Sequence, residues 1–152
     1  MFGPTAIRIH PIFTQIKDWA GDTRPDGVEA LLEFTDAFGD PTKASGQVIF
    51  ELYTYRRSSP DPRGQRVGGP WAYTLNSLTA QRRHWKRIGA AYSFQLPFVA
   101  IGRKSHYVLT AQWTPIRGDR MFDQIVLVPP EAEDRPLPTE EPSRAPSTRP
   151  AD

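Results

Sequence analysis

The sequence contains no cysteine among its 152 residues. This absence excludes disulfide bonds, thiolate metal sites and a cysteine nucleophile. It also lacks any apolar run near the roughly 20 residues that a membrane-spanning helix needs. The first residues carry neither the basic nor the apolar segment of a secretory signal. A cytoplasmic protein and an exported protein whose signal has been removed both fit this pattern.

Motifs for catalysis and cofactor binding are missing as well. The chain has no G-x-S-x-G nucleophile elbow, no G-x-G-x-x-G dinucleotide motif and no phosphate-binding P-loop. Its three histidines, His10, His84 and His106, do not have the close spacing of metal-ligand pairs. The sequence therefore nominates no catalytic residue, no cofactor and no firm metal site, and we expect a protein that is not an enzyme.

Aromatic residues, proline and glycine are present in quantity, with 16 prolines and 11 glycines among short apolar runs. Within these runs apolar side chains recur at every second position, which is the period of a half-buried strand. The pattern predicts seven strands, at residues 6–13, 28–35, 47–55, 71–75, 91–98, 106–114 and 122–128. Seven short strands separated by turns are typical of an all-β, immunoglobulin-like sandwich. A jelly roll or a small barrel remains an alternative.

One helix is expected between strands, at about residues 77–87. Leu78, Trp85 and Ile88 would share one apolar stripe at helical spacing. Asn76 or Ser77 would cap the N-terminus of this helix, and Gly89 would end it.

The charge distribution divides the chain into two parts. Residues 1–130 hold 16 basic and 11 acidic residues, a net charge of +5, and form the predicted sandwich domain. Residues 131–152 hold six acidic residues, three arginines and five prolines, with Leu137 as their one large aliphatic residue. Such a segment buries too little apolar surface to offset the entropy of ordering, so we predict a disordered, acidic, Pro-rich tail.

The densest basic segment is 81–87, with the sequence QRRHWKR. Arg82, Arg83, Lys86 and Arg87 surround a tryptophan, a combination that can hold phosphates and stack on a base, so polyanion or nucleic-acid binding is one hypothesis. The alternative is a short helix with a buried tryptophan and solvated charges. If strand directions alternate, the loops 36–46, 76–90 and 115–121 share one end of the domain, where Asp36 and Asp40 would be available to pair with the arginines.

Three aspartates at four-residue spacing, Asp18, Asp22 and Asp26, suggest a weak Ca²⁺ site. Their spacing does not match the EF-hand loop, and Lys17 and Arg24 reduce the local negative charge. The alternative is that the aspartates form Asx turns beside Gly21 and Gly27.

Four aromatic residues, Tyr53, Tyr55, Trp19 and Trp71, are difficult to place together in one core. An exposed aromatic strip of this kind is one way that carbohydrate- and peptide-binding modules present a surface. Alternatively, Tyr53 and Tyr55 cover a sheet edge or pack under the 56–70 loop.

Several turn-and-strand phrases together resemble uncharacterised immunoglobulin-like domains of bacterial envelope lipoproteins, particularly those of planctomycetes. The phrases are DTRPDGVEA at 22–30, DAFGDPTK at 36–43, Gly46, and FELY at 50–53. The resemblance covers roughly residues 5–128 and is not specific to any activity. It implies a non-enzymatic module that is exported and associated with the cell envelope.

Overall fold

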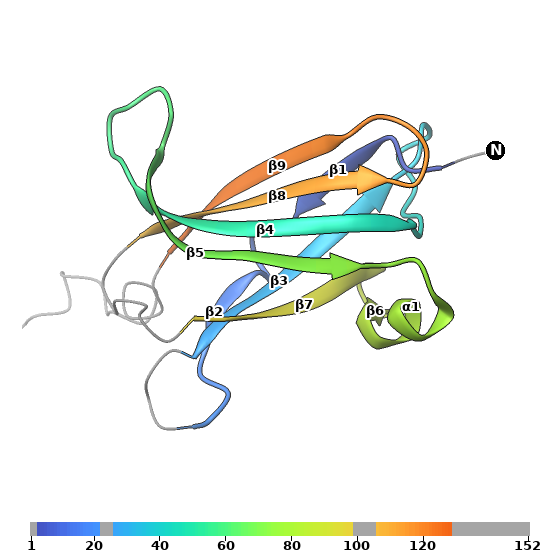
Figure 1. The fold of residues 1–152 in the computed structure, drawn as a ribbon, viewed down its shortest axis with the longest axis horizontal. Helices are drawn as coiled ribbons and strands as arrows, with labels where there is room; N and C mark the ends of the chain where they lie inside the picture. Colours follow the sequence, from blue (N-terminus) through green and yellow to red (C-terminus); the bar gives the residue numbers. More distant parts are fainter. Residues whose placement is uncertain (1–2, 22–25, 99–105, 129–152) are drawn as a thin grey trace, which may run out of the picture.

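The computed structural model describes residues 3–21, 26–98 and 106–128, and these residues form a mostly β structure with one short helix (Figure 1). The elements, in chain order, are β1 (Ala6–Ile9), β2 (Gln15–Lys17), β3 (Gly27–Thr35), β4 (Gly46–Tyr55), β5 (Arg63–Thr74), α1 (Leu78–His84), β6 (Trp85–Lys86), β7 (Ala91–Pro97), β8 (Tyr107–Pro115) and β9 (Met121–Leu127).

The strands form two antiparallel sheets. In the first sheet the order is β1-β3-β7-β6, and β2 pairs with β3 on the same edge as β1. In the second sheet the order is β5-β4-β8-β9. Because side chains alternate between the two faces of a strand, each sheet directs one set of residues inward and the other outward.

Aromatic side chains fill the space between the two sheets. Phe34 and Phe94 from the first sheet meet Trp113 and Phe50 from the second, with ring centroids 4.6 Å apart for Phe34–Trp113 and 5.3 Å for Phe50–Phe94. All four side chains are buried. Rings at these separations and at tilted angles attract one another in addition to burying apolar area. The alternation of apolar residues therefore correctly predicts the two-sheet, all-β class.

The strand count and some boundaries differ from the prediction, because the described residues contain nine strands. The predicted 6–13 strand ends at Ile9, since Pro11 and its neighbours form a turn, and the chain re-enters the sheet as β2. The segment 63–70, expected to be a loop, belongs to β5. Its pairing with β4 contains register shifts, and such irregular pairing can accommodate glycine and proline. The glycines and Pro70 of β5 hide the alternation of apolar residues by which a strand is recognised in a sequence.

The helix is shorter than expected and its predicted apolar stripe is wrong. Ser77 caps α1 by accepting a hydrogen bond from the Ala80 N–H, but the helix ends at His84 and Trp85 begins β6. Leu78 and Ile88 are 64% and 95% exposed, and α1 buries none of its residues. Trp85 packs against the core from an extended backbone, so helical spacing does not apply to it.

The predicted grouping of loops at one end is confirmed for the described residues. The 36–45 connection, α1 and the turn between β8 and β9 lie at the same end of the molecule (Figure 1). The Ile116 N–H donates to the Ser45 carbonyl at 3.3 Å, and Leu75 and Gly46 exchange backbone hydrogen bonds. This end therefore brings together residues that are distant in sequence.

A hydrogen bond to the Asp123 side chain of β9 connects the first strand, β1, to the last. The Asp123 carboxylate accepts a hydrogen bond from the Ile9 N–H at 2.7 Å, and Ile9 is fully buried. We expect Asp123→Ala to lower the free energy of unfolding by about 1–3 kcal/mol, because a buried backbone donor loses its acceptor. Urea unfolding measures this change. Asp119→Ala, at an exposed loop position, is the control, and equal effects of the two variants would contradict the assignment.

Candidate anion-binding site

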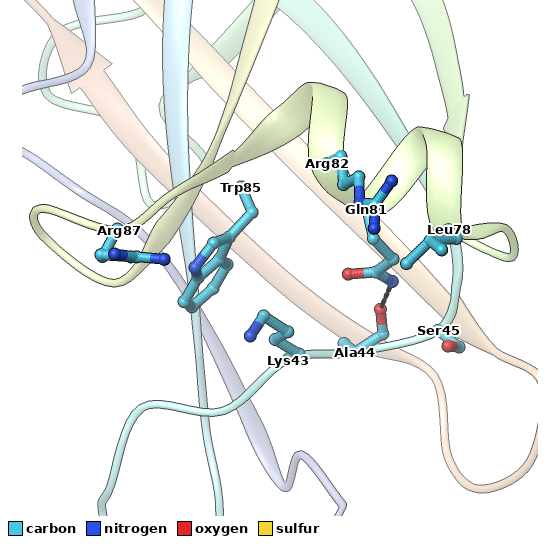
Figure 2. A pocket seen from close by; sticks show the side chains of 8 residues that line it. All are labelled: Lys43, Ala44, Ser45, Leu78, Gln81, Arg82, Trp85 and Arg87. Carbon is cyan, nitrogen blue, oxygen red and sulfur yellow. Dashed lines mark hydrogen bonds between the residues drawn. The ribbon is translucent and has the colours of Figure 1, made fainter.

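A cavity of about 640 Å³ lies between α1, β6 and the segment that precedes β4. Cavities of this size are typical of small-ligand sites. Lys43, Ala44 and Ser45 form one wall, and Leu78, Gln81, Arg82, Trp85 and Arg87 form the other (Figure 2). We call it the Trp85 pocket.

Gln81 and Tyr92 hold the two walls of the pocket together. The Gln81 amide nitrogen donates to the Ala44 carbonyl at 2.7 Å and to the Leu75 carbonyl at 3.2 Å, and the first of these bonds is drawn in Figure 2. The Gln81 carbonyl accepts from the Tyr92 hydroxyl at 2.6 Å, while the Tyr92 oxygen accepts from the Ala44 N–H at 3.1 Å. Because Tyr92 is buried in the core, this network fixes α1 relative to the 43–45 segment.

Trp85 forms the aromatic part of the site. Its ring meets the Tyr92 ring edge-on at 5.0 Å between centroids, and the Lys43 ammonium lies 4.8 Å from the centroid of the Trp85 ring. This ammonium–ring distance is within the range of a cation–π interaction. Figure 2 shows the Arg87 guanidinium directed toward the same ring from the opposite side. The ring is thus positioned by the core, with Lys43 over it and Arg87 in the same pocket.

None of the described acidic side chains lines the Trp85 pocket. Within the described residues, Lys43, Arg82 and Arg87 take part in no ion pair. The expected pairing of Asp36 and Asp40 with these arginines is not found there. Asp36 instead caps its own turn, with one carboxylate oxygen accepting from the Phe38 and Asp40 N–H groups at 2.9 and 3.0 Å. Three positive charges therefore share one cavity, and an anionic ligand would relieve their mutual repulsion.

The structure divides the four basic residues of the predicted cluster between two sides of β6. Arg82 and Arg87 line the Trp85 pocket, whereas Arg83 and Lys86 line a second concavity beside Trp19 and Tyr73. Lys43 is the site residue that sequence reasoning missed. The grouping of the 36–46 and 76–90 loops at one end was the signal that could have identified it.

The aspartates of the Ca²⁺ hypothesis have other contacts. One Asp18 oxygen accepts from the Gly21 N–H at 2.8 Å, and one Asp26 oxygen accepts from the Ala20 N–H at 2.8 Å. Asp22 lies outside the described residues. In the described part of the chain, no three His, Asp or Glu residues are grouped so that they could hold a metal ion. Ca²⁺ binding stays a prediction, and the two described carboxylates organise the 18–21 loop.

The predicted aromatic strip is not one surface. Tyr53 lies on β4. The Arg63 guanidinium carbon lies 5.6 Å from the centroid of the Tyr53 ring, and the Tyr53 hydroxyl donates to the Glu51 carboxylate at 2.9 Å. Trp71 packs against the core. Trp19 lies near the second concavity, on another side of the molecule.

Comparisons with known proteins give no assignment: no family model, no curated protein and no solved structure matches this chain. Among the described residues, no helix has the length and apolarity required to cross a membrane. The residues 131–152 of the predicted tail lie outside the described part of the chain.

The buried phenol beside the pocket makes stability depend on pH. Burial raises the pKa of Tyr92 from its ordinary value of 10.0, and the Ala44 N–H opposes part of this rise. Burial likewise raises the pKa of Tyr73.

The unfolded chain therefore loses these phenolic protons at a lower pH than the folded protein does, so the free energy of unfolding decreases as the pH rises beyond about 10. Urea unfolding between neutral and alkaline pH measures this decrease. Tyr92→Phe should be less stable at neutral pH but show a smaller alkaline decrease, and an unchanged alkaline slope would contradict this account.

Proposed function

We propose that this chain is a non-enzymatic, immunoglobulin-like module that binds an anionic partner through the Trp85 pocket. The observation that carries the proposal is that Lys43, Arg82 and Arg87 line one cavity together with Trp85, and that no carboxylate of the described residues lines it. Cations of this kind contact phosphate, sulfate or carboxylate groups, and the ring offers a face on which a planar group stacks.

Pre-organisation of the site supports binding. The Gln81–Tyr92 network fixes the pocket walls through backbone groups and a buried phenol, so little ordering entropy remains for a ligand to offset. The flexible parts are the ends of the lysine and arginine side chains. Their attraction for an anion is strong at low ionic strength and is screened by salt.

The strand order supports the immunoglobulin-like part of the proposal. If β1, β3, β7 and β6 are equated with strands A, B, E and D, and β4, β8 and β9 with C, F and G, then the first sheet has the order A-B-E-D and the second contains C-F-G. β5 would be an additional edge strand beside C. No disulfide joins the sheets, and the Phe34–Trp113 contact occupies the space between them.

Association with the cell envelope is part of the proposal and rests on the resemblance at residues 22–30, 36–43, 46 and 50–53. An exported module that binds anions would meet anionic polymers and lipid headgroups outside the cytoplasm. Fractionation of the source cells with an antibody against this domain tests the location. We expect the protein in the envelope fraction, and recovery in the cytoplasm alone would remove this part of the proposal.

A paired substitution tests the Trp85 pocket. Lys43→Ala with Arg82→Ala removes two cations that line this cavity. We expect the salt concentration that elutes the protein from a heparin column to fall, and the slope of log affinity for heparin against log salt to decrease by about two, because fewer counterions are released.

The control is Arg56→Ala with Arg57→Ala, at the connection between β4 and β5. It lowers the net charge by the same amount at the opposite end of the domain. We expect this control to elute close to the unchanged protein. Equal losses from the two double variants would show that binding follows net charge alone, and passage of the unchanged protein through the column at physiological salt would overturn the proposed function.

A further inference from the structure

A groove runs along the outer face of the first sheet, next to the Trp85 pocket, and Trp85 and Arg87 line both. One part, of about 630 Å³, lies between Phe13 and Ile88 above Leu31. The other part, of about 570 Å³, lies beside Trp19 and Pro97. Glu29, Lys86 and Ser93 line both parts, so the two form one continuous depression. We call it the outer-sheet groove.

Trp19 is an exposed aromatic platform at one end of this groove. It is 39% exposed, and its ring packs over Gly27, where a Cβ atom would lie only 2.9 Å from ring atom Cζ3. The hydrogen bonds from Gly21 to Asp18 and from Ala20 to Asp26 hold the loop that carries the ring. A glycine and two aspartates thus keep Trp19 against the sheet with part of its surface open.

Phe13 and Ile88 form the walls at the other end. The His10 Nδ1 atom accepts from the Ile12 and Phe13 N–H groups at 3.2 Å each, and the His10 and Phe13 rings are 4.7 Å apart, so the turn is held in place. Phe13 is 58% exposed and Ile88 is almost fully exposed. Large apolar side chains that are exposed to solvent beside a concave surface indicate an interaction site.

The floor and rim of the groove are polar and positively charged. Glu29 is the acidic residue that the described part of the chain contributes to the lining. It accepts from the Ser93 hydroxyl at 2.9 Å, and its carboxylate lies 3.7 Å from the Lys17 ammonium. Arg83, Lys86 and Arg87 add three cations, and Gln95 adds an amide. The site therefore combines two aromatic surfaces, hydrogen-bonding side chains and an excess of positive charge.

We propose that the outer-sheet groove binds an acidic oligosaccharide, a short chain of sugar rings that carry carboxylates. The apolar faces of sugar rings pack on Trp19 and Phe13, hydroxyl groups bond to Glu29, Ser93 and Gln95, and the carboxylates meet Arg83 and Lys86. A peptide strand fits less well, because the floor of the groove is the face of a sheet. The backbone of β3 is already paired with β2 and β7 there, so the floor itself offers no unpaired strand for strand addition.

Titration with a tetramer of galacturonic acid, followed by two-dimensional amide and indole NMR, tests this proposal. We expect saturable shifts of the Trp19 indole and of the amides of Glu29 and Lys86. Trp19→Ala should weaken binding by about tenfold, the value of one aromatic stacking contact of about 1.4 kcal/mol. Trp19→Phe should retain part of the affinity, which separates loss of stacking from loss of folding. Phe122→Ala, at an exposed aromatic residue on β9, should bind as the unchanged protein does.

Three results would overturn the proposal: no shift at millimolar tetramer, shifts confined to Lys43 and Arg82, or tighter binding of a thymidine tetranucleotide at the same residues. An uncharged tetramer of galactose should bind more weakly than the acidic one. Equal affinity for the two would contradict the role of Arg83 and Lys86.

Because Lys43→Ala with Arg82→Ala leaves the residues that line the outer-sheet groove unchanged, that double variant should still bind the acidic tetramer. Failure of the Trp85 pocket proposal is therefore distinguishable from failure of this one.

Discussion

The hydrogen bonds of Tyr92 connect the hydrophobic core to the surface that carries the basic residues. Its ring is buried between the sheets, meeting Phe34 at 5.6 Å, while its hydroxyl bonds with Gln81 and the Ala44 N–H. A buried phenol requires a partner, and here the partners belong to α1 and to the 43–45 segment. The same core contact that stabilises the fold therefore sets the width of the Trp85 pocket.

A short helix with no buried residues needs such a connection, because seven residues in α1 form too few internal hydrogen bonds to be stable alone. The Ser77 cap holds its N-terminus, the Gln81 side chain ties its middle to the 43–45 segment, and Trp85 continues directly into the sheet. Arg82 and Arg83 lie in the last turn of α1, where the helix dipole favours positive charge. Arg82 also lines the Trp85 pocket, and Arg83 lines the outer-sheet groove.

Much of the fold was predictable from the sequence, because apolar residues at every second position specify which face of each strand is buried. This holds for Val28 to Phe34, whereas in β8 Val108 and Thr110 are buried as well as the alternating residues Tyr107 to Trp113. Two features could not be predicted from periodicity. β2 and β6 are too short to show a period, and the glycines of β5 conceal a strand whose pairing depends on β4. The basic cluster was recognisable in the sequence, but Lys43 joins it through tertiary contact alone.

The end of α1 at His84 determines how one basic segment serves two surfaces. A continuous helix would place all four basic residues on one exposed side, because residues three or four positions apart are neighbours on a helix surface. These residues are Arg82, Arg83, Lys86 and Arg87. The helix instead gives way at Trp85 to the extended β6, which ends at Lys86, and Arg87 lies in the turn that follows. Arg87 joins Arg82 at the Trp85 pocket and also reaches the edge of the outer-sheet groove, whereas Lys86 joins Arg83 in the groove. The tryptophan between them is half-buried because it belongs to both the core and the pocket wall. Arg82 and Arg83 already face different hollows within α1, and Trp85 and Arg87 line both the Trp85 pocket and the outer-sheet groove, so the two cationic surfaces are neighbours.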